Sequence, residues 1–279
     1  MHSKIMKSYN LNKIAVLTTV INWDLYKKSS QYFPKGIQKY VIDGRNGMFG
    51  IDSIYFMMEK FKGLDVDWLI MADEDVLFLN PEAVYDIVDH MIANNYILSG
   101  VRDGGDIPNR TFSPYSINTF FSIVNLKKVK SIWNKEEVKK NYYILENEFK
   151  EDYSKMKEKY DVMSLYEPYY CFYFWLRRKG EKILFLESEA PFEDKITTLT
   201  YTPNKQKLFY HTWYARSYGN NKKHTDRINK VFEKLIFNSS SYEVPIVWKD
   251  NLFYIKRFLR KQKRRLEMKF EKIFKKLTF

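Results

Sequence analysis

The sequence lacks disulfides, a secretion signal and membrane-spanning runs. Its 279 residues include one cysteine, Cys171, so no disulfide can form within the chain. A chain without disulfides is typical of a reducing compartment. Residues 1–12 are polar and basic and contain no apolar signal core, and no stretch approaches the roughly 20 apolar residues that a transmembrane helix needs. We therefore expect a cytoplasmic protein that does not cross a membrane.

Internal repeats and low-complexity linkers are also missing from the sequence. The chain is instead rich in aromatic residues, with 22 Tyr and 21 Phe, which supply ample material for a hydrophobic core. A chain of this length suits one large α/β domain, or one domain with an appendage.

The positive charge is concentrated near the carboxyl end. The formal net charge is +13, and the stretch from Lys256 to Lys276 carries +9 of it, from eleven Lys or Arg against Glu267 and Glu271. The remainder carries about +4, which is an ordinary value for a soluble domain. We therefore predict one domain over residues 1–250 and a basic helical tail over residues 251–279.

The tail has the pattern of a basic amphipathic helix. Apolar residues recur mostly at three- and four-residue spacings, and the other faces are nearly all Lys and Arg. The apolar positions are Ile255, Phe258, Leu259, Leu266, Phe270, Ile273, Phe274 and Leu277. Helices of this type lie on anionic membrane surfaces, so we expect residues 252–279 to attach the protein to the inner face of a membrane. The alternatives are a helix docked on its own domain or on a partner chain, and a nucleic-acid-binding arm, which we do not favour.

Apolar runs alternate with amphipathic helical patterns along the first 125 residues. Strands are expected at residues 13–20, 36–42, 68–72, 96–101 and 117–124, and helices at 22–30, 52–61 and 81–94. This alternation predicts a Rossmann-like α/β fold, with a mainly parallel sheet and helices on both faces. Further along, the pattern predicts one or two exposed helices over 131–163, a buried aromatic helix over 168–179, and strands at 183–186 and 208–213.

The stretch over residues 67–81 organises the candidate site. An apolar run at 68–72 fits a strand buried on both faces of a parallel sheet, and Asp73-Glu74-Asp75 follows at its carboxyl end, where open α/β sheets bind ligands. Adjacent carboxylates repel one another unless a cation is present. Hard cations such as Mn²⁺ and Mg²⁺ take carboxylate oxygens and keep positions open for phosphate. We therefore predict a Mn²⁺ or Mg²⁺ site with Asp73 and Asp75 as ligands. The alternative is a solvated loop whose acids cap the helix near Pro81.

One of the four histidines is a candidate third metal ligand. His211 ends the apolar strand 208–210, and Trp213, Tyr214 and Arg216 follow it closely. Imidazole suits the same metals as a carboxylate pair. A histidine that merely packs at a strand end is the alternative. The two aromatic residues could stack on a sugar and the arginine could contact a diphosphate, or all three could be packing residues.

Polar residues at the other strand ends are candidates for binding a nucleotide. Thr18 and Thr19 end the first strand, and Asp43 and Arg45 follow the second, so all would lie on the same rim as Asp73. Asp43 could accept hydrogen bonds from a ribose or a base, and Arg45 could neutralise phosphate charge. The remaining candidates are Asp52, Glu74 and Arg102.

These residues together resemble the GT-A-type glycosyltransferases, which transfer a sugar from a nucleotide donor, usually UDP-linked, with Mn²⁺ or Mg²⁺. Asp73-Glu74-Asp75 corresponds to the family's strand-terminal Asp-x-Asp motif, and a Leu-Asn-Pro helix start follows at residues 79–81. Many members supply a metal-binding histidine near the carboxyl end of the domain, and His211 is similarly placed. Thr18, Asp43 and the Arg45 loop are similar to the nucleotide-binding segment. The resemblance covers roughly residues 10–215 and implies a metal that stabilises the diphosphate leaving group.

The resemblance also implies a catalytic base if the reaction inverts the configuration of the sugar. In inverting members this base is often an acid at the start of a helix that ends in an Arg-rich segment and Gly. Glu167 precedes such a helix, although Pro168 stands where the family usually has a second acid. Asp103 is the rival base, since it follows a strand in a flexible loop. A carboxylate that merely favours the helix dipole is the alternative for Glu167, and a retaining enzyme needs no base of this kind.

We therefore predict a glycosyltransferase that moves a sugar from a nucleotide-diphosphate donor, with a UDP-sugar favoured, to a hydroxyl of a glycan or lipid-linked acceptor, as in polysaccharide biosynthesis. A metal-dependent nucleotidyltransferase that makes sugar nucleotides is the alternative enzyme. Those proteins usually carry a glycine-rich phosphate loop after the first strand, whereas residues 18–23 contain no glycine. A non-catalytic protein whose tail binds membrane or nucleic acid is the third possibility.

Overall fold

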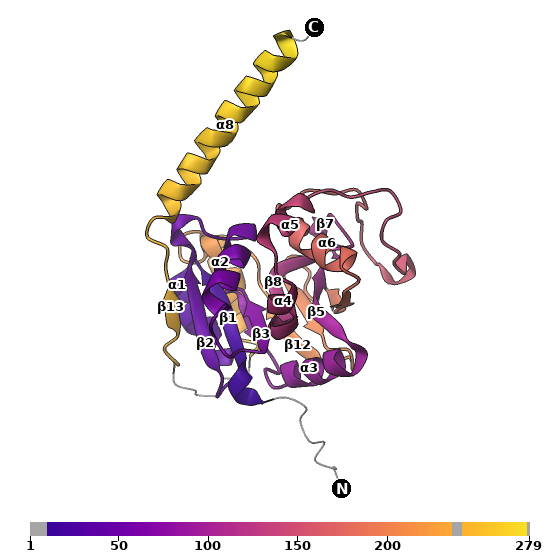
Figure 1. The fold of residues 1–279 in the computed structure, drawn as a ribbon. Helices are drawn as coiled ribbons and strands as arrows, with labels where there is room; N and C mark the ends of the chain where they lie inside the picture. Colours follow the sequence, from indigo (N-terminus) through magenta and orange to yellow (C-terminus); the bar gives the residue numbers. More distant parts are fainter. Residues whose placement is uncertain (1–9, 236–241, 278–279) are drawn as a thin grey trace.

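A central sheet of seven strands forms the body of the protein (Figure 1). The structure is a computed structural model and describes residues 10–235 and 242–277. The sheet has the order β13-β2-β1-β3-β8-β5-β9. Its strands are β1 (Ile14–Val20), β2 (Gln38–Asp43), β3 (Trp68–Ala72), β5 (Tyr96–Arg102), β8 (Ile117–Asn125), β9 (Lys182–Phe185) and β13 (Ile246–Trp248). All neighbouring strands are parallel except β8, which runs antiparallel to β3 and β5. The predicted mainly parallel α/β sheet is confirmed.

The middle strands are buried on both faces, as their unbroken apolar runs predict. On β1, Ala15 and Leu17 face one hydrophobic core, and Ile14 and Val16 face the other. The first core lies under α2 (Ile51–Phe61), α4 (Leu126–Ile132), α5 (Lys135–Lys140) and α6 (Tyr170–Arg178). The second lies under α1 (Trp23–Ser29) and α3 (Ala83–Asn94). Helices therefore cover both faces of the sheet.

A second sheet of four strands adjoins the first, in the order β10-β11-β12-β4. Its strands are β4 (Val76–Phe78), β10 (Ser188–Glu189), β11 (Thr198–Tyr201) and β12 (Lys207–His211). Because β4 follows β3 after three residues, the acids Asp73, Glu74 and Asp75 occupy the turn between the two sheets. β12 runs antiparallel to β4 and pairs His211 with Val76, which brings the histidine beside that turn. A short ribbon, β6 (Gly104–Ile107) with β7 (Arg110–Thr111), follows β5.

Several local expectations differ from the structure. Helix α2 begins after Gly50, whose φ of 59° few other residues adopt, so Asp52 lies in the first turn and is not the cap. Helix α3 begins two residues later than Pro81, after Glu82. Residues 141–169 contain little regular structure beyond one short 3-10 turn at Tyr153–Lys155. Glu151 pairs there with Arg102 of β5 and with Arg177 of α6. Along the chain, α7 (Lys222–Phe232) comes between β12 and β13.

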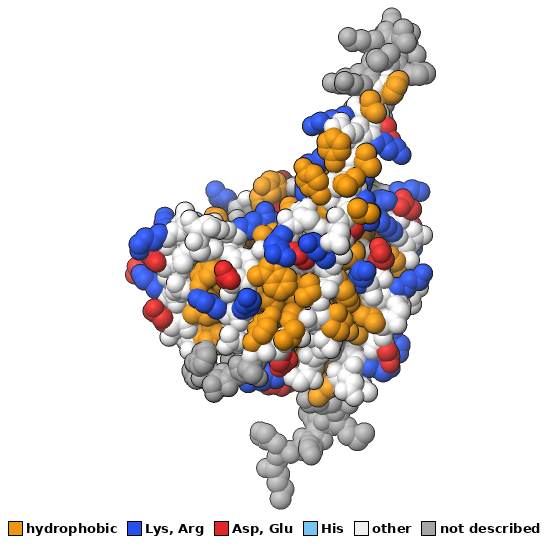
Figure 2. Space-filling model, turned by 90° about the vertical axis from the view of Figure 1, so that its left-hand side faces the viewer, with side chains coloured by type: hydrophobic (Ala, Val, Ile, Leu, Met, Phe, Trp, Pro, Cys, Tyr) orange, Lys and Arg blue, Asp and Glu red, His pale blue; other side chains and the backbone are white. Residues whose placement is uncertain are grey.

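The carboxyl-terminal helix α8 (Phe253–Leu277) projects from the body (Figure 1). Its apolar side chains form an exposed stripe flanked by Lys and Arg (Figure 2). Ile255, Phe258, Leu259, Leu266 and Phe270 are 54%, 52%, 59%, 55% and 64% exposed. Ile273, Phe274 and Leu277 lie outside the residues whose side chains are described. The amphipathic helix is therefore present as predicted. Among the described residues, none of the helices has both the length and the apolar character needed to cross a bilayer.

The first turns of α8 are fastened to the body. Phe253 is 6% exposed and belongs to the core under α2. Arg257 donates a hydrogen bond to the carbonyl of Gly47 at 3.3 Å, and Arg260 pairs with Asp52 through both carboxylate oxygens at 2.8 and 3.1 Å. The start of the helix is thus packed as part of the domain, although the sequence predicts a boundary at residue 250.

Candidate active site

A cavity of about 550 Å³ opens at the carboxyl ends of β1 and β3. Its lining includes the end of β1, the acids after β3, Phe49 and Gly50 before α2, residues 118–120 of β8, Arg110, Glu167, His211 and residues 213–217. This volume suits a ligand of small-molecule size. The cavity therefore lies at the sheet edge where the alternating pattern predicts a ligand site.

A tight turn places the three acids at this edge. The Val76 N–H donates to the carbonyl of Asp73 at 3.1 Å, and the Asp73 N–H donates to the carbonyl of Phe120 on β8 at 2.9 Å. From the other side, the N–H of Thr212 donates to the carbonyl of Asp75 at 3.0 Å. The backbone of the turn is therefore held by both sheets.

Asp73, Asp75 and His211 come together at the cavity wall. One ligand atom from each lies within 4.8 Å of the others, and Nε2 of His211 is 3.1 Å from Oδ1 of Asp75. The His211 ring stacks on Phe120 with a centroid distance of 4.0 Å, while its buried Nδ1 has no hydrogen-bond partner among the described residues. Stacking therefore orients the ring with Nε2 toward the carboxylates. Two carboxylates and one imidazole suit Mn²⁺ or a similar divalent ion, so the donor set fits the predicted metal.

The electrostatics of the turn favour a bound cation. Burial, and then the neighbouring Glu74 and Asp75 carboxylates, raise the pKa of Asp73 well above its usual range, while Arg216 acts in the opposite direction. Burial, and then the charge of Asp75, raise the pKa of Glu74 to about 7. Bringing a divalent ion to this turn relieves the same repulsion that raises these pKa values.

Glu74 serves a different role from the two aspartates. Its Oε1 accepts hydrogen bonds from the backbone N–H groups of Ile21 and Asn22, at 3.1 and 3.2 Å. Asn22 in turn caps α1 through the N–H of Leu25. Although Glu74 lines the cavity, its carboxyl group ties the acidic turn to the end of β1. In this structure its carboxylate is engaged with the backbone, and its predicted nucleotide contact stays a prediction.

Replacing Glu74 with Gln should stabilise the protein at neutral pH in the presence of EDTA. The folded state holds its Glu74 proton up to a pKa of about 7, whereas the unfolded carboxyl loses it near 4.5. Stability therefore falls as pH rises from about 4.5 to 7, by up to about 3 kcal/mol from this group. Urea unfolding of wild type and Glu74→Gln at pH 5 and pH 8 tests this. The advantage of the variant should grow with pH, and an advantage that is constant would contradict the linkage.

Of the nucleotide-binding candidates at the ends of the first two strands, Thr19 lines the cavity and the others do not. Thr19 lines the cavity, but Thr18 points to the opposite face of the sheet and is 1% exposed. Asp43 is 2% exposed, and its carboxylate accepts from Nε and Nη2 of Arg45 at 2.8 and 2.6 Å. That hydrogen bond holds the pKa of Asp43 below its usual range. Neither Asp43 nor Arg45 lines the cavity, so the structure does not bring this pair to the candidate site.

Asp52 and Arg102 also lie away from the cavity. Asp52 pairs with Arg260 of α8. Arg102 donates to Glu151 at 2.8 Å, and its guanidinium lies 3.5 Å from the centroid of the Phe185 ring. Both side chains are engaged in pairs that hold segments of the fold together. The structure therefore does not bring these two predicted nucleotide-binding residues to the candidate site.

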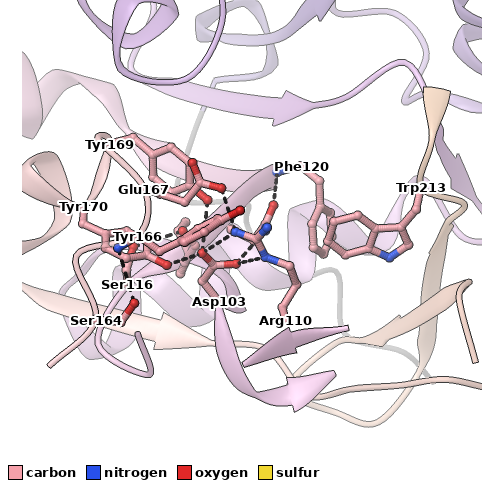
Figure 3. Close-up of polar contacts among 12 residues, drawn as sticks. Asp103, Arg110, Ser116, Phe120, Ser164, Tyr166, Glu167, Tyr169, Tyr170 and Trp213 are labelled. Carbon is pink, nitrogen blue, oxygen red and sulfur yellow. Dashed lines mark hydrogen bonds and ion pairs between the residues drawn. The ribbon is translucent and has the colours of Figure 1, made fainter. Parts of the chain in front are cut away.

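The two predicted bases occupy different positions around Arg110 (Figure 3). Glu167 lines the cavity, and its side chain is 25% exposed. Asp103 is fully buried behind Arg110 and does not line the cavity. An acceptor hydroxyl can reach Glu167 but not Asp103. Of the two predicted bases, the structure therefore brings Glu167 and not Asp103 to the cavity.

Several cavity residues carry no sequence motif. Arg110 comes from the two-residue strand β7, and Phe49 from the loop before α2. Trp213 and Tyr214, which sequence suggests as sugar-stacking residues, both line the cavity with φ of 60°. Two consecutive non-glycine residues in the left-handed region cost free energy, which is typical of functional sites. This pair of φ angles leaves no trace in residue type, so the strain could not be predicted.

No protein-family model matches the sequence, and no curated protein matches it either. Among solved structures, S. aureus TarS is similar at 14% identity over 43% of this chain and 48% of its own, with a TM-score of 0.28. A mannosyltransferase from Pyrobaculum calidifontis, in complex with GDP-Man and Mn²⁺, is 8% identical over 45% of this chain and 48% of its own, with a TM-score of 0.29. A variant of Drosophila β1,4-galactosyltransferase 7, in complex with manganese, UDP-Gal and xylobiose, is 13% identical over 82% of each chain, with a TM-score of 0.40. The chain spans about half the length of the first two, and likenesses of this extent leave the function to be argued from the site.

Proposed function

We propose that this protein is a metal-dependent GT-A-type glycosyltransferase that uses a nucleotide-diphosphate sugar. The observation that carries the proposal is the meeting of Asp73, Asp75 and His211 at the wall of a cavity at the carboxyl ends of parallel strands. A cluster of this kind suits a metal that keeps open positions for phosphate oxygens. Two of the similar solved structures contain manganese and a sugar nucleotide.

Asp73, Asp75 and His211 would hold the metal, which when bound supplies a Lewis acid for the diphosphate leaving group. Arg216 lines the same cavity and acts electrostatically on Asp73, so it is placed to contact the diphosphate as well. Thr19 lies at the end of β1, where a nucleoside would enter. These residues bind and orient the donor.

Glu167 is the proposed base of an inverting reaction. Its carboxylate takes the proton of the acceptor hydroxyl while that oxygen attacks the anomeric carbon. The bond from the anomeric carbon to the diphosphate oxygen breaks, and the electron pair leaves with the nucleoside diphosphate. If transfer retains configuration, Glu167 has no such role.

We further propose that the acceptor is a glycan or lipid-linked sugar at a cytoplasmic membrane face. The exposed apolar stripe of α8, flanked by Lys and Arg, supports this, since such helices bind anionic lipid surfaces. A UDP-sugar is the favoured donor because the resemblance to the GT-A family rests on the motif that UDP-sugar enzymes use.

Calorimetric titration of UDP into the protein, with and without Mn²⁺, tests the proposal. We expect UDP to bind at least about tenfold more tightly with Mn²⁺, because Asp73, Asp75 and His211 would hold the cation and its charge would offset the repulsion between the acidic turn and the diphosphate. Binding of GDP or CDP in place of UDP would keep the enzyme class and change the donor. If none of the three binds in the presence of metal, the glycosyltransferase proposal is wrong.

A further inference from the structure

We propose that Arg110 positions Glu167 for catalysis and that the buried Asp103 acts through it; this inference rests on the proposed function. The guanidinium lies between the two carboxylates (Figure 3). Nε and Nη2 of Arg110 donate to the two oxygens of Asp103 at 2.6 and 2.8 Å, and Nη2 also donates to Oε1 of Glu167 at 2.9 Å. Arg110 thus connects a buried anion with one that faces the cavity.

Asp103 provides a fixed anchor for this connection. Besides Arg110, its carboxylate accepts hydrogen bonds from Nδ2 of Asn118 and from the hydroxyls of Tyr169 and Tyr170. Burial, and then the charge of Asp103, raise the pKa of both tyrosines, so their hydroxyls stay protonated and donate. A carboxylate with this many donors cannot turn toward a substrate. Its position therefore defines the position of the guanidinium.

The backbone around Asp103 is equally constrained. Its N–H donates to the carbonyl of Ser116 at 3.0 Å, and its carbonyl accepts from the N–H of Phe112 at 3.2 Å. A Cβ on Gly104, the next residue, would lie 2.1 Å from the Phe112 carbonyl oxygen. The two strands of the β6–β7 ribbon therefore approach at a distance that only glycine permits. This close approach fixes the ribbon beside Asp103, and the side chain of Arg110, on β7, reaches the Asp103 carboxylate from there.

Glu167 depends on Arg110 for its orientation. Arg110 contacts Oε1, and in the described part of the chain no donor contacts Oε2, which leaves that oxygen for an acceptor hydroxyl. Glu167 follows irregular chain and comes before α6 begins at Tyr170, so no helix of its own holds it. A side chain that must place one oxygen within hydrogen-bond reach of a substrate requires support of this kind.

Arginine is suited to this position for reasons that lysine does not share. Its planar fork engages both oxygens of Asp103 and still has a hydrogen for Glu167. The guanidinium also lies 4.6 Å from the ring centroid of Phe112, which stacks on Tyr166 at 3.8 Å and 6°. Lysine supplies the charge but reaches one carboxylate at a time. We therefore expect Arg110→Lys to keep part of the function and Arg110→Met to lose it.

A double-mutant cycle between Arg110→Met and Glu167→Gln tests the inference. UDP release from UDP-glucose, UDP-galactose and their N-acetyl forms gives kcat, and calorimetry gives the affinity for UDP with Mn²⁺. We expect Glu167→Gln to lower kcat about a hundredfold and Arg110→Met at least about tenfold. The kcat of the double variant should lie within about threefold of that of Glu167→Gln, because both changes remove proton abstraction by a correctly oriented Glu167. UDP affinity should change by less than about threefold in each variant, which a misfolded cavity would not permit.

The control is Arg178→Met. Arg178, on α6, also pairs through two nitrogens with one carboxylate, that of Glu148 at 2.5 and 2.7 Å, but it does not line this cavity. The Arg178→Met variant should keep a kcat within about twofold of wild type. Losses that multiply in the double variant, or a loss of UDP affinity in Arg110→Met, would overturn the inference. If Arg110→Met does not fold, Arg110→Lys replaces it in the same cycle. Failure of wild type to bind any of UDP, GDP and CDP in the presence of Mn²⁺ would overturn the proposed function, and this inference with it.

Discussion

Replacing Asp75 with asparagine should remove metal-dependent nucleotide binding and lower sugar transfer by about a thousandfold or more. Asp75 is 3% exposed, its main-chain carbonyl accepts from the N–H of Thr212, and Oδ1 of its carboxylate lies 3.1 Å from Nε2 of His211. Asparagine keeps the shape but offers one neutral oxygen, which binds a divalent ion weakly. A thousandfold loss corresponds to about 4 kcal/mol of transition-state stabilisation. Calorimetry of UDP with Mn²⁺ and UDP release from a UDP-sugar measure the two effects.

The matched control is Asp86→Asn, the same chemical change at an exposed residue of α3. It should leave UDP affinity and turnover within about twofold of wild type. His211→Gln should fall between the two, because it removes one of three donors. UDP binding that stays metal-dependent in Asp75→Asn would mean that the metal is held elsewhere, and the assigned cluster would then be wrong.

The central sheet could be predicted because its signals are local. Strands buried on both faces read as unbroken apolar runs, and β1 and β3 appear within about a residue of their observed bounds. Sheet order and the reversed direction of β8 depend on pairings between distant segments. Edge strand β13 was not predicted at all: it has three residues, and Ile246 and Val247 remain half-exposed at the edge. A run this short carries no period from which a strand can be recognised.

The parts of the candidate site that lie at the end of a single strand could be predicted from the sequence. Asp73 and Asp75 follow an apolar run, and His211 ends another, so their positions depend on local pattern and on the family resemblance. Thr18 and Thr19 could have been separated from sequence alone, because alternate residues of a strand face opposite sides. Thr19 shares the cavity side with Leu17, whereas Thr18 faces the other side.

Other charged candidates are paired with side chains outside the cavity lining, and the sequence does not show which charges pair. Asp52 is neutralised by Arg260, 208 residues away. Asp43 pairs with a residue two positions on, and Asp103 with one seven positions on. A carboxylate at a strand end therefore serves a ligand or an ion pair according to which cation the fold brings near it. Asp103 combines both situations: it forms an ion pair with Arg110, and Arg110 lines the cavity.

Shortening α8 at two different points should separate membrane binding from donor binding. Removing residues 264–279 deletes six of the eleven cations of the tail and its distal apolar residues. Since each Lys or Arg near an anionic surface contributes about 1 kcal/mol, binding to phosphatidylglycerol vesicles should weaken at least about tenfold. UDP affinity with Mn²⁺ should stay within about twofold. Sedimentation with vesicles and calorimetry of UDP measure the two effects, and phosphatidylcholine vesicles show how much binding is electrostatic.

Removing residues 251–279 should in addition impair the cavity itself. This deletion exposes the core that Phe253 covers, removes Arg257 from Gly47 in the loop that leads to Phe49, and removes Arg260 from Asp52 at the start of α2. Phe49 lines the cavity, with the guanidinium of Arg257 5.5 Å from its ring centroid. We therefore expect a lower melting temperature, as when a core side chain is truncated. We also expect UDP binding to weaken about tenfold, because the deletion removes the support of Phe49. Arg260→Ala should reproduce part of the loss of UDP affinity and Arg265→Ala, on the exposed part of the helix, none of it. Equal UDP affinity in both truncations would show that α8 is a separate tail, as its sequence suggests, and that its first turns do not support the donor site.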